Sequence, residues 1–241
     1  MDTYQVVSLS GGKDSTAMLL MMLERGEHID EIVVCDTGME FPEMYQHLEK
    51  LEEHVGISFT RLKASYSFEY LMFDYKRKRG KFQGKCGYGW PRPKARWCTS
   101  KLKTDVINRY FRELSKHKNV IQCVGIAFDE SQRAKDKRYP LIEYGVTEDQ
   151  ALKYCYSKGF DWEGLYEIFN RVSCWCCPLQ PIAELRKLRE FRPDLWKKLC
   201  DMDKKSWNSF RIDYDTQQLE KRFAMEDRQL SLFGGDQSCQ N

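Results

Sequence analysis

The sequence predicts an α/β fold, a doubly wound and mainly parallel sheet followed by a helical, cysteine-bearing C-terminal part. Short apolar runs at Tyr4–Ser8, Glu31–Cys35, Ser58–Leu62 and Val120–Val124 alternate with helical patterns. Alternating strands and helices indicate parallel strands joined by right-handed crossovers. The second run is continuously apolar, which is typical of a strand buried on both faces. After Pro140 the pattern changes to helices, with a cysteine-bearing turn at Ser173–Pro178, and from about Met225 the periodicity is lost.

The helices between these strands have recognisable ends. Gly26 is a stop signal for the helix expected at Thr16–Arg25, and Pro42 suits the first turn of the next helix, which runs to about Val55. Thr99 or Ser100 is expected to cap a long fourth helix. The expected domains are an α/β domain at residues 1–145, a helical cysteine-bearing region at 146–225 and a flexible tail at 226–241.

The corner between the first strand and the first helix reads Ser10-Gly11-Gly12-Lys13-Asp14-Ser15. Two glycines let the backbone turn with its amides pointing inward. The new helix adds unpaired N–H groups and the positive end of its dipole. Such a corner binds phosphate, and it is not a Walker loop because the G-x-x-x-x-G-K-[ST] pattern is absent.

This hexapeptide resembles the pyrophosphate loop of the PP-loop ATP pyrophosphatases, the superfamily that contains the phosphoadenosine-phosphosulfate (PAPS) reductase family. The resemblance implies an adenine nucleotide α-hydrolase-like fold in which Ser10 to Ser15 bind ATP. Lys13 would neutralise the departing pyrophosphate, and Asp14 would hold Mg²⁺ through water. The unaltered Lys13 and Asp14 favour the adenylating members, since true PAPS reductases carry a changed loop.

Two more loops are expected at the carboxyl ends of strands, where ligands bind in such sheets. Asp36-Thr37-Gly38-Met39-Glu40-Phe41-Pro42-Glu43 resembles the family's D-T-G-x-x-F-x-E segment, which implies that Asp36, Thr37 and Gly38 lie beside the nucleotide. Asp36 could bind ribose hydroxyls or Mg²⁺, or simply form a turn before a helix. The third loop is similar to the family's G-I-R-x-x-E-S segment but has Ala127 in place of arginine, a charge that Arg133 could replace. Its candidate binding residues are Gly125, Asp129, Glu130 and Ser131.

The cysteines form a second candidate site. Arg96-Trp97-Cys98-Thr99 begins an R-W-C-T-x-x-L-K element like that of the family, and Cys174-Trp175-Cys176-Cys177 resembles the C-W-x-C element of its iron–sulfur members, notably the DNA phosphorothioation sulfur-transfer enzymes. Cys98, Cys174 and Cys177 are the candidate ligands, with Cys176 or Cys86 as a fourth. An iron–sulfur cluster, a structural Zn²⁺ and unmetallated thiols all remain open.

Positive charge is concentrated in one segment. The 241-residue chain has a net charge of +3, yet Lys76–Lys103 contains eleven Lys or Arg and no Asp or Glu. Phe82, Tyr88, Trp90 and Trp97 are interleaved with these cations, a pattern that suits an unstacked nucleic-acid strand. A loop that closes over a smaller anion, such as a triphosphate, is the alternative.

The C-terminal tail and the composition complete the predictions. Gln229–Phe233 resembles the pentapeptide that bacterial proteins dock on the DNA sliding clamp, although an end that packs on its own domain would look the same. The sequence has no apolar run near the ~20 residues that span a membrane. Its polar start is no signal peptide, which predicts a cytoplasmic protein with free thiols.

The predicted function is an ATP-hydrolysing PP-loop enzyme of DNA modification. It would adenylate an acceptor, expected to be nucleic acid, and handle sulfur with a cysteine-held metal centre. One alternative is a PAPS or adenylylsulfate reductase that forms sulfite, although only Ser238-Cys239-Gln240-Asn241 stands where reductases have E-C-G-[IL]-H. A non-catalytic, zinc-bound nucleic-acid-binding subunit is the other.

Overall fold

The computed structural model describes residues 3–80 and 82–233, the last four of these by their backbone alone. The chain divides into two compact units. Met1–Phe68 and Trp97–Trp175 form the first, called here the sheet unit; Glu69–Arg96 and Cys176–Asn241 form the second, called here the helical unit. The expected borders at 145 and 225 are therefore not those of the structure. Residues 146–175 belong with the sheet, and part of the basic segment belongs with the C-terminal helices.

A four-stranded parallel sheet is the centre of the sheet unit. The strands β1 (Thr3–Leu9), β2 (Glu31–Asp36), β3 (Phe59–Lys63) and β4 (Asn119–Val124) lie in the order β3-β2-β1-β4. In the register of β1 with its two neighbours, Ser8 pairs with Val33 of β2 and with Val124 of β4. All three pairings are parallel, so the predicted doubly wound α/β fold is confirmed.

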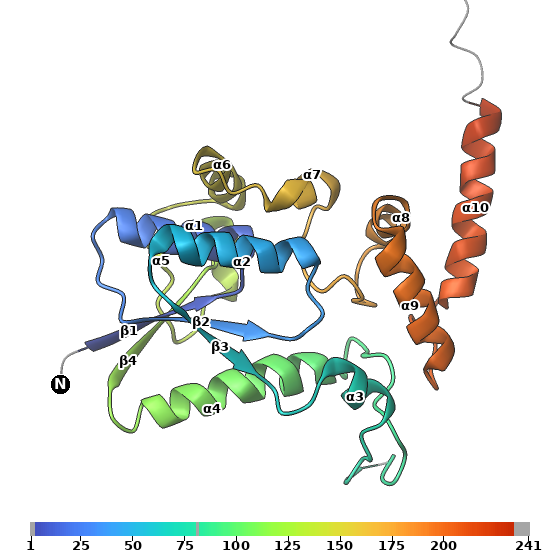
Figure 1. Ribbon diagram of the computed structural model, residues 1–241, viewed down its shortest axis with the longest axis horizontal. Helices are drawn as coiled ribbons and strands as arrows, with labels where there is room; N and C mark the ends of the chain where they lie inside the picture. Colours follow the sequence, from blue (N-terminus) through green and yellow to red (C-terminus); the bar gives the residue numbers. More distant parts are fainter. Residues whose placement is uncertain (1–2, 81, 234–241) are drawn as a thin grey trace, which may run out of the picture. The chain divides into compact units, whose positions relative to one another are not determined.

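The helices of the sheet unit lie on both faces of the sheet. Figure 1 shows α1 (Lys13–Glu24) and α2 (Pro42–Val55) on one face and α4 (Asp105–Leu114) on the other. The chain winds from β1 through β2 to β3 on the first face and then returns to β4 beside β1 by way of the second face. The winding direction therefore reverses between β1 and β4, and ligands of open α/β sheets bind at such a point, at the carboxyl ends of the strands.

The fourth helix begins differently from the prediction. Thr99–Thr104 form a π-helical turn, η1, and neither this turn nor α4 has a side-chain cap. The expected apolar face of α4 is half-buried rather than buried.

Short helices follow β4 and complete the sheet unit. They are η2 (Phe128–Arg133), α5 (Pro140–Glu143), α6 (Glu148–Ser157), η3 (Trp162–Gly164) and α7 (Leu165–Ile168). Thr147 caps α6 in a capping box, in which its hydroxyl accepts from the Gln150 amide while the Gln150 side chain accepts from the Thr147 amide. α6 packs on α1, and this brings residues 148–166 to the start of α1.

The helical unit has its own apolar core. It contains α8 (Ile182–Phe191), α9 (Pro193–Lys205), α10 (Thr216–Phe233) and nearly all of α3 (Phe68–Phe73). Asp203 links these elements, because its carboxylate accepts from the Trp90 indole at 2.9 Å and from the Thr216 amide and hydroxyl at 2.8 and 2.9 Å. Fully buried side chains of this core include Met72, Leu185, Leu188, Leu199, Phe210, Leu219 and Phe223.

Part of the expected flexible tail at residues 226–241 is helical. α10 begins at Thr216 and continues to Phe233, beyond the expected border at 225. Ion pairs of Arg186 and Arg189 on α8 with Asp227 hold this part of α10. The spacing of apolar residues does not reveal such ion pairs, so it could not predict this part of the helix. The side chains of the proposed clamp-docking residues Leu230–Phe233, and residues 234–241, lie outside the described part. No helix in the described ranges is long and apolar enough to cross a membrane.

Candidate functional site

The turn after β1 builds the predicted phosphate corner. Gly12 is the N-cap residue of α1 and has an extended backbone. Because glycine has no side chain, the N-cap residue leaves the first amides of α1 without a side-chain cap. The Ser15 hydroxyl donates to the Gly12 carbonyl at 3.0 Å and accepts from the Ser10 amide at 3.2 Å. Ser10 Oγ lies 3.0 Å from Ser15 Oγ. The two serines therefore fix the turn.

Two glycines allow the backbone to approach closely here. Gly11 has φ +81°, and a Cβ on it would lie 2.7 Å from Met44 Sδ. A Cβ on Gly125, at the end of β4, would lie 2.6 Å from Ser15 Cα. Backbone atoms cannot yield as a side-chain end can. Gly125 is therefore required for β4 to end against the start of α1, and it joins the first and third predicted loops.

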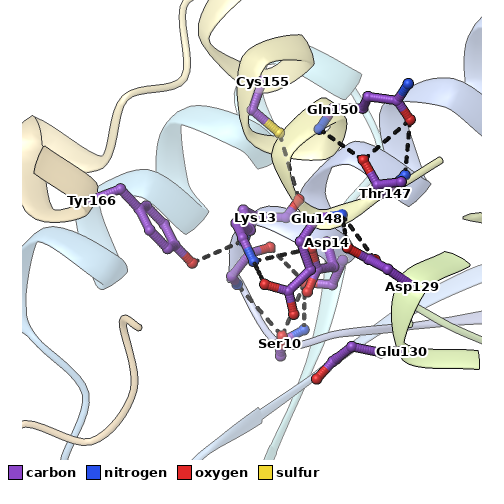
Figure 2. A network of polar contacts seen from close by, with 12 residues as sticks. Ser10, Lys13, Asp14, Asp129, Glu130, Thr147, Glu148, Gln150, Cys155 and Tyr166 are labelled. Atoms are coloured by element: carbon purple, nitrogen blue, oxygen red, sulfur yellow. Dashed lines mark hydrogen bonds and ion pairs between the residues drawn. The ribbon is translucent and has the colours of Figure 1, made fainter. Parts of the chain in front are cut away.

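Lys13 lies among carboxylates contributed by three elements. Its Nζ is 2.8 Å from Glu148 Oε2 and 3.5 Å from Asp14 Oδ1, as Figure 2 shows. One oxygen each of Asp14, Glu130 and Glu148 lies within 4.8 Å of the others. Burial raises the pKa of Asp14, an effect that Lys13 opposes. Asp14 Oδ1 is buried and accepts no hydrogen bond from the described residues. Clustered carboxylate oxygens with an unsatisfied acceptor are the donor set that Mg²⁺ prefers.

Asp129 positions this cluster rather than joining it. Its carboxylate accepts from the Glu148 amide at 3.1 Å, so the third loop holds the first residue of α6 (Figure 2). Arg133, expected to replace a missing arginine, forms an ion pair with Glu130. Ser131 is exposed, and its carbonyl accepts from the Ala134 amide. The structure therefore brings Glu130 to the corner, while roles for Arg133 and Ser131 stay predictions.

Two aromatic residues that sequence reasoning missed close the corner from another side. The Trp162 indole donates to the Gly11 carbonyl at 2.7 Å, and the Lys13 amide donates to the Tyr166 hydroxyl at 3.0 Å. Trp162 and Glu163 have left-handed φ values of 53° and 51°, followed by Gly164 at 77°. Left-handed backbone at a tryptophan is strained, and such strain clusters at functional sites. The two helices that carry these residues, η3 and α7, are too short to give a periodic signal that could have revealed them.

The second loop is held mainly by its own contacts. Asp36 accepts from the Gly38 amide at 2.8 Å and the Tyr45 hydroxyl at 3.0 Å, and it pairs with Lys63 at 2.9 Å. Burial alone would raise the pKa of Asp36, but these three partners lower it below its usual value. Asp36 thus forms a turn before α2, which the sequence analysis gave as the alternative to a binding role. Contact with ribose or Mg²⁺ stays a prediction.

A second polar cluster surrounds Glu40. Its Oε1 accepts from Thr37 Oγ1 at 3.2 Å and from the Cys174 thiol at 3.5 Å, and it pairs with Lys103 Nζ at 3.1 Å. Burial lowers the pKa of Lys103, but the charges of Glu40 and Cys174 outweigh this and raise it. Thr37 and Cys174 were predicted for different sites, and the structure places them 4.0 Å apart. Glu40 and Lys103 were not predicted as site residues.

The other cysteine ligands are distributed over both units. Cys98, directly before η1, belongs with Cys174 to the sheet unit, whereas Cys176 and Cys177 belong to the helical unit. Cys176 is buried and Cys86 is exposed. A shared metal site of these thiols therefore stays a prediction.

Comparison with known proteins adds the family. The family described as "Phosphoadenosine phosphosulfate reductase domain" matches residues 4–180. The chain belongs to this family. The PAPS reductase family assignment thus covers the sheet unit from Tyr4 onward and confirms the resemblance seen in the motifs.

Two curated proteins and one solved structure are similar to the chain. The uncharacterized protein MJ0066 of Methanocaldococcus jannaschii is 31% identical over 80% of the chain, and MJ0973 of the same organism is 24% identical over 90%. The chain spans 40% and 50% of these relatives' lengths. A crystal structure of PAPS reductase from Candida auris, a phosphate complex, matches with a TM-score of 0.52 and 17% identity over 73% of this chain and 82% of that one. At this identity the likeness supports the fold.

Proposed function

We propose that the sheet unit binds ATP at the Ser10–Ser15 corner and transfers its adenylyl group to an acceptor with release of pyrophosphate. The observation that carries this proposal is the corner itself. It joins a helix start that has no capping side chain of its own helix with a lysine and three carboxylates, at the point where the sheet reverses its winding.

In this reaction an acceptor atom attacks the α-phosphorus and the bond from that phosphorus to the bridging oxygen of pyrophosphate breaks. The backbone amides and Lys13 would stabilise the negative charge that the leaving pyrophosphate gains. Lys13 is close enough to Glu148 and Asp14 to be held at the mouth of the corner. Asp129 and Tyr166 would act by positioning, through the Glu148 and Lys13 amides.

The residues present fit a magnesium ion. Asp14, Glu130 and Glu148 would hold it, directly or through water, and Asp14 Oδ1, which accepts no hydrogen bond from described groups and has Lys13 Nζ at 3.5 Å, would gain a closer cation. The ion would supply positive charge at the phosphates.

The acceptor and the sulfur chemistry extend the proposal. We propose a nucleic-acid acceptor and a sulfur-handling centre built on Cys98, Cys174 and Cys177 with Cys176 or Cys86, holding iron–sulfur or alternatively Zn²⁺. Thiolates are the soft donors that both metals take. The Glu40 carboxylate that accepts from Cys174 could receive its proton when the thiol ionises. Metal analysis of Cys98→Ser and Cys174→Ser, with Cys35→Ser as control, tests this part separately.

Calorimetry with a non-hydrolysable ATP analogue tests the main proposal. Lys13→Ala should lower the affinity at least tenfold while the unfolding transition is kept. Lys153→Ala is the matched control, since this exposed lysine of α6 pairs with Asp149. Equal affinity of Lys13→Ala and wild type would contradict the proposal.

The family description supports a second candidate, reduction of PAPS to sulfite. Cys239, the C-terminal thiol that would correspond to the reductase nucleophile, lies outside the described residues. Sulfite release from PAPS in the presence of a dithiol reductant, without consumption of ATP, would favour this candidate. Binding of nucleic acid without turnover of either nucleotide would favour the non-catalytic subunit.

A further inference from the structure

The helical unit exposes a basic hairpin next to an exposed indole. Residues 76–96 belong to this unit and include nine of the eleven cations of the basic segment. Lys76 and Cys86 form an antiparallel bridge, and the Arg77 amide and carbonyl bond to Lys85 and Gly84. The predicted loop is therefore a closed hairpin, which presents exposed cations at Lys76, Lys78, Arg79 and Lys85.

Arg77 organises the aromatic side of this hairpin. Its guanidinium donates to the carbonyls of Gly87 at 2.9 Å and Tyr88 at 2.7 Å. The same group lies 4.8, 5.0 and 5.4 Å from the ring centroids of Phe82, Tyr88 and Trp207. One cation of the segment is thus used to hold rings, and its neighbours remain at the surface.

Trp207 is fixed in place but only partly covered. A Cβ on Gly89 would lie 2.8 Å from its indole, so the ring packs closely on that backbone. The next residue, Asn208, accepts from the Trp90 amide at 2.7 Å and donates to the Trp90 carbonyl at 3.1 Å. The indole is nevertheless 54% exposed, whereas the other five tryptophans of the chain, all in described ranges, are at most 9% exposed.

The exposed rings form one surface with a groove. Phe82 is 36% exposed, and its ring centroid lies 5.8 Å from that of Trp207. A groove of about 510 Å³ lies beside them, lined by Met72, Phe73, Asp74, Cys86, Lys205 and Trp207. Rigid aromatic faces among cations are how proteins bind unpaired strands, because bases stack on the rings and phosphates meet the charges.

We propose that this surface binds single-stranded nucleic acid, with unpaired bases stacked on Trp207 and Phe82 and phosphates at the hairpin cations. The proposal deepens the proposed function and rests on it for the acceptor class. A duplex would bind more weakly, because its bases are stacked within the helix and offer the rings no free face.

Fluorescence anisotropy of labelled oligonucleotides, measured without ATP, tests the proposal. The probes are oligo(dT) and oligo(rU) of roughly 12 nucleotides and a duplex of the same length. Either single strand should bind more tightly than the duplex, and the two arms show whether DNA or RNA is preferred. Affinity should fall several-fold or more between about 50 and 200 mM salt. Because ATP is absent, failure here and failure of the nucleotide proposal are separate results.

Substitutions locate the site. Trp207→Ala should weaken single-strand binding about tenfold, and Trp207→Phe, which keeps a stacking face, should restore most of it. Phe191→Ala is the matched control, since this ring is 49% exposed in the same unit but lies outside the basic segment. Lys78→Gln with Lys85→Gln should reduce the salt dependence. Unchanged binding by both Trp207 variants, or equal affinity for the duplex, would overturn the proposal.

Discussion

The two units achieve rigidity at their surfaces in different ways. At the phosphate corner, backbone packs on backbone. Gly125 touches Ser15, and polar side chains such as Ser10 and Ser15 bond to the turn itself. At the basic hairpin the backbone bonds across the turn, as between Arg77 and Lys85, but the aromatic side is held by a side chain, because one guanidinium lies over three rings. The corner is thus shaped for a small anion that meets amides, and the hairpin for a ligand that meets ring faces.

This difference predicts which substitutions each region tolerates. A corner built from close backbone contact should fail when any atom is added. A surface built around one side chain should fail when that side chain is changed. Four experiments sharpen or break this comparison.

Gly125→Ala should have the largest effect. The added Cβ would overlap backbone of Ser15, and we expect a loss of about 3 kcal/mol of unfolding free energy together with loss of ATP-analogue binding. Gly145→Ala is the control, because a Cβ there meets open space and pays only for its left-handed φ, about 1–2 kcal/mol. Urea unfolding and calorimetry measure both. An equal cost at the two glycines would contradict backbone packing as the cause.

Arg77→Lys tests the hairpin. An ammonium cannot donate to two carbonyls and lie over three rings at once, so we expect a loss of about 2 kcal/mol and greater quenching of Trp207 by iodide. Arg79→Lys, at an exposed position, should change the unfolding free energy by no more than about 0.5 kcal/mol. It should leave the quenching of Trp207 by iodide unchanged. If both variants behave alike, Arg77 does not organise the surface.

His47 makes the sheet unit sensitive to pH. It is buried beneath the corner, 2.9 Å from Thr16 Oγ1 and stacked on Trp162. Burial, with the charge of Lys50, lowers the pKa of His47 to about 3, although Asp161 opposes this. The unfolded chain binds a proton near its ordinary pKa of about 6.5 and the folded chain does not. The contribution of His47 to stability is therefore full above pH 6.5 and is lost as the pH falls toward 3.

Urea unfolding between about pH 6.5 and 5 measures this contribution, before most carboxylates titrate. The free energy of unfolding should fall by at most about 1.4 kcal/mol per pH unit. His47→Gln should remove that slope, and His54→Gln, at an exposed position of α2, should keep it. If the slope survives in His47→Gln, groups other than His47 cause it. Asp14 is not one of them, because burial raises its pKa and a raised carboxyl pKa makes the unfolding free energy rise as the pH falls.

Tyr166→Phe should have the smallest effect. It removes the hydroxyl that accepts from the Lys13 amide and should cost about 1 kcal/mol of unfolding free energy in the absence of nucleotide. If a phosphate oxygen accepts from the Lys13 amide, a saturating ATP analogue should reduce the difference in unfolding free energy between Tyr166→Phe and wild type. Tyr156→Phe, partly exposed on α6, is the control. A difference that stays constant with ligand would separate Tyr166 from the phosphate site.

The sequence by itself determined the local features of this protein. The turn after β1 depends on neighbouring residues, so Gly11, Gly12, Ser10 and Ser15 could be predicted from one short stretch. The strand β2 could be predicted because a strand buried on both faces is apolar along most of its length. Motif order also predicted the PAPS reductase family, which residues 4–180 confirm.

Only the tertiary structure decided which distant groups meet. Glu148 and Tyr166 reach Lys13 across 135 and 153 residues of chain, and no spacing rule relates such positions. The same limit explains why the sequence did not reveal that Asp129 holds the start of α6, or that Lys103, counted among the cations of the basic segment, pairs with Glu40. Charges alone do not specify their partners, because many acidic groups lie within reach of a long side chain. The packing of α6 and η1 within the sheet unit decides which acidic group each lysine meets. That choice of partner determines the chemistry available at each site.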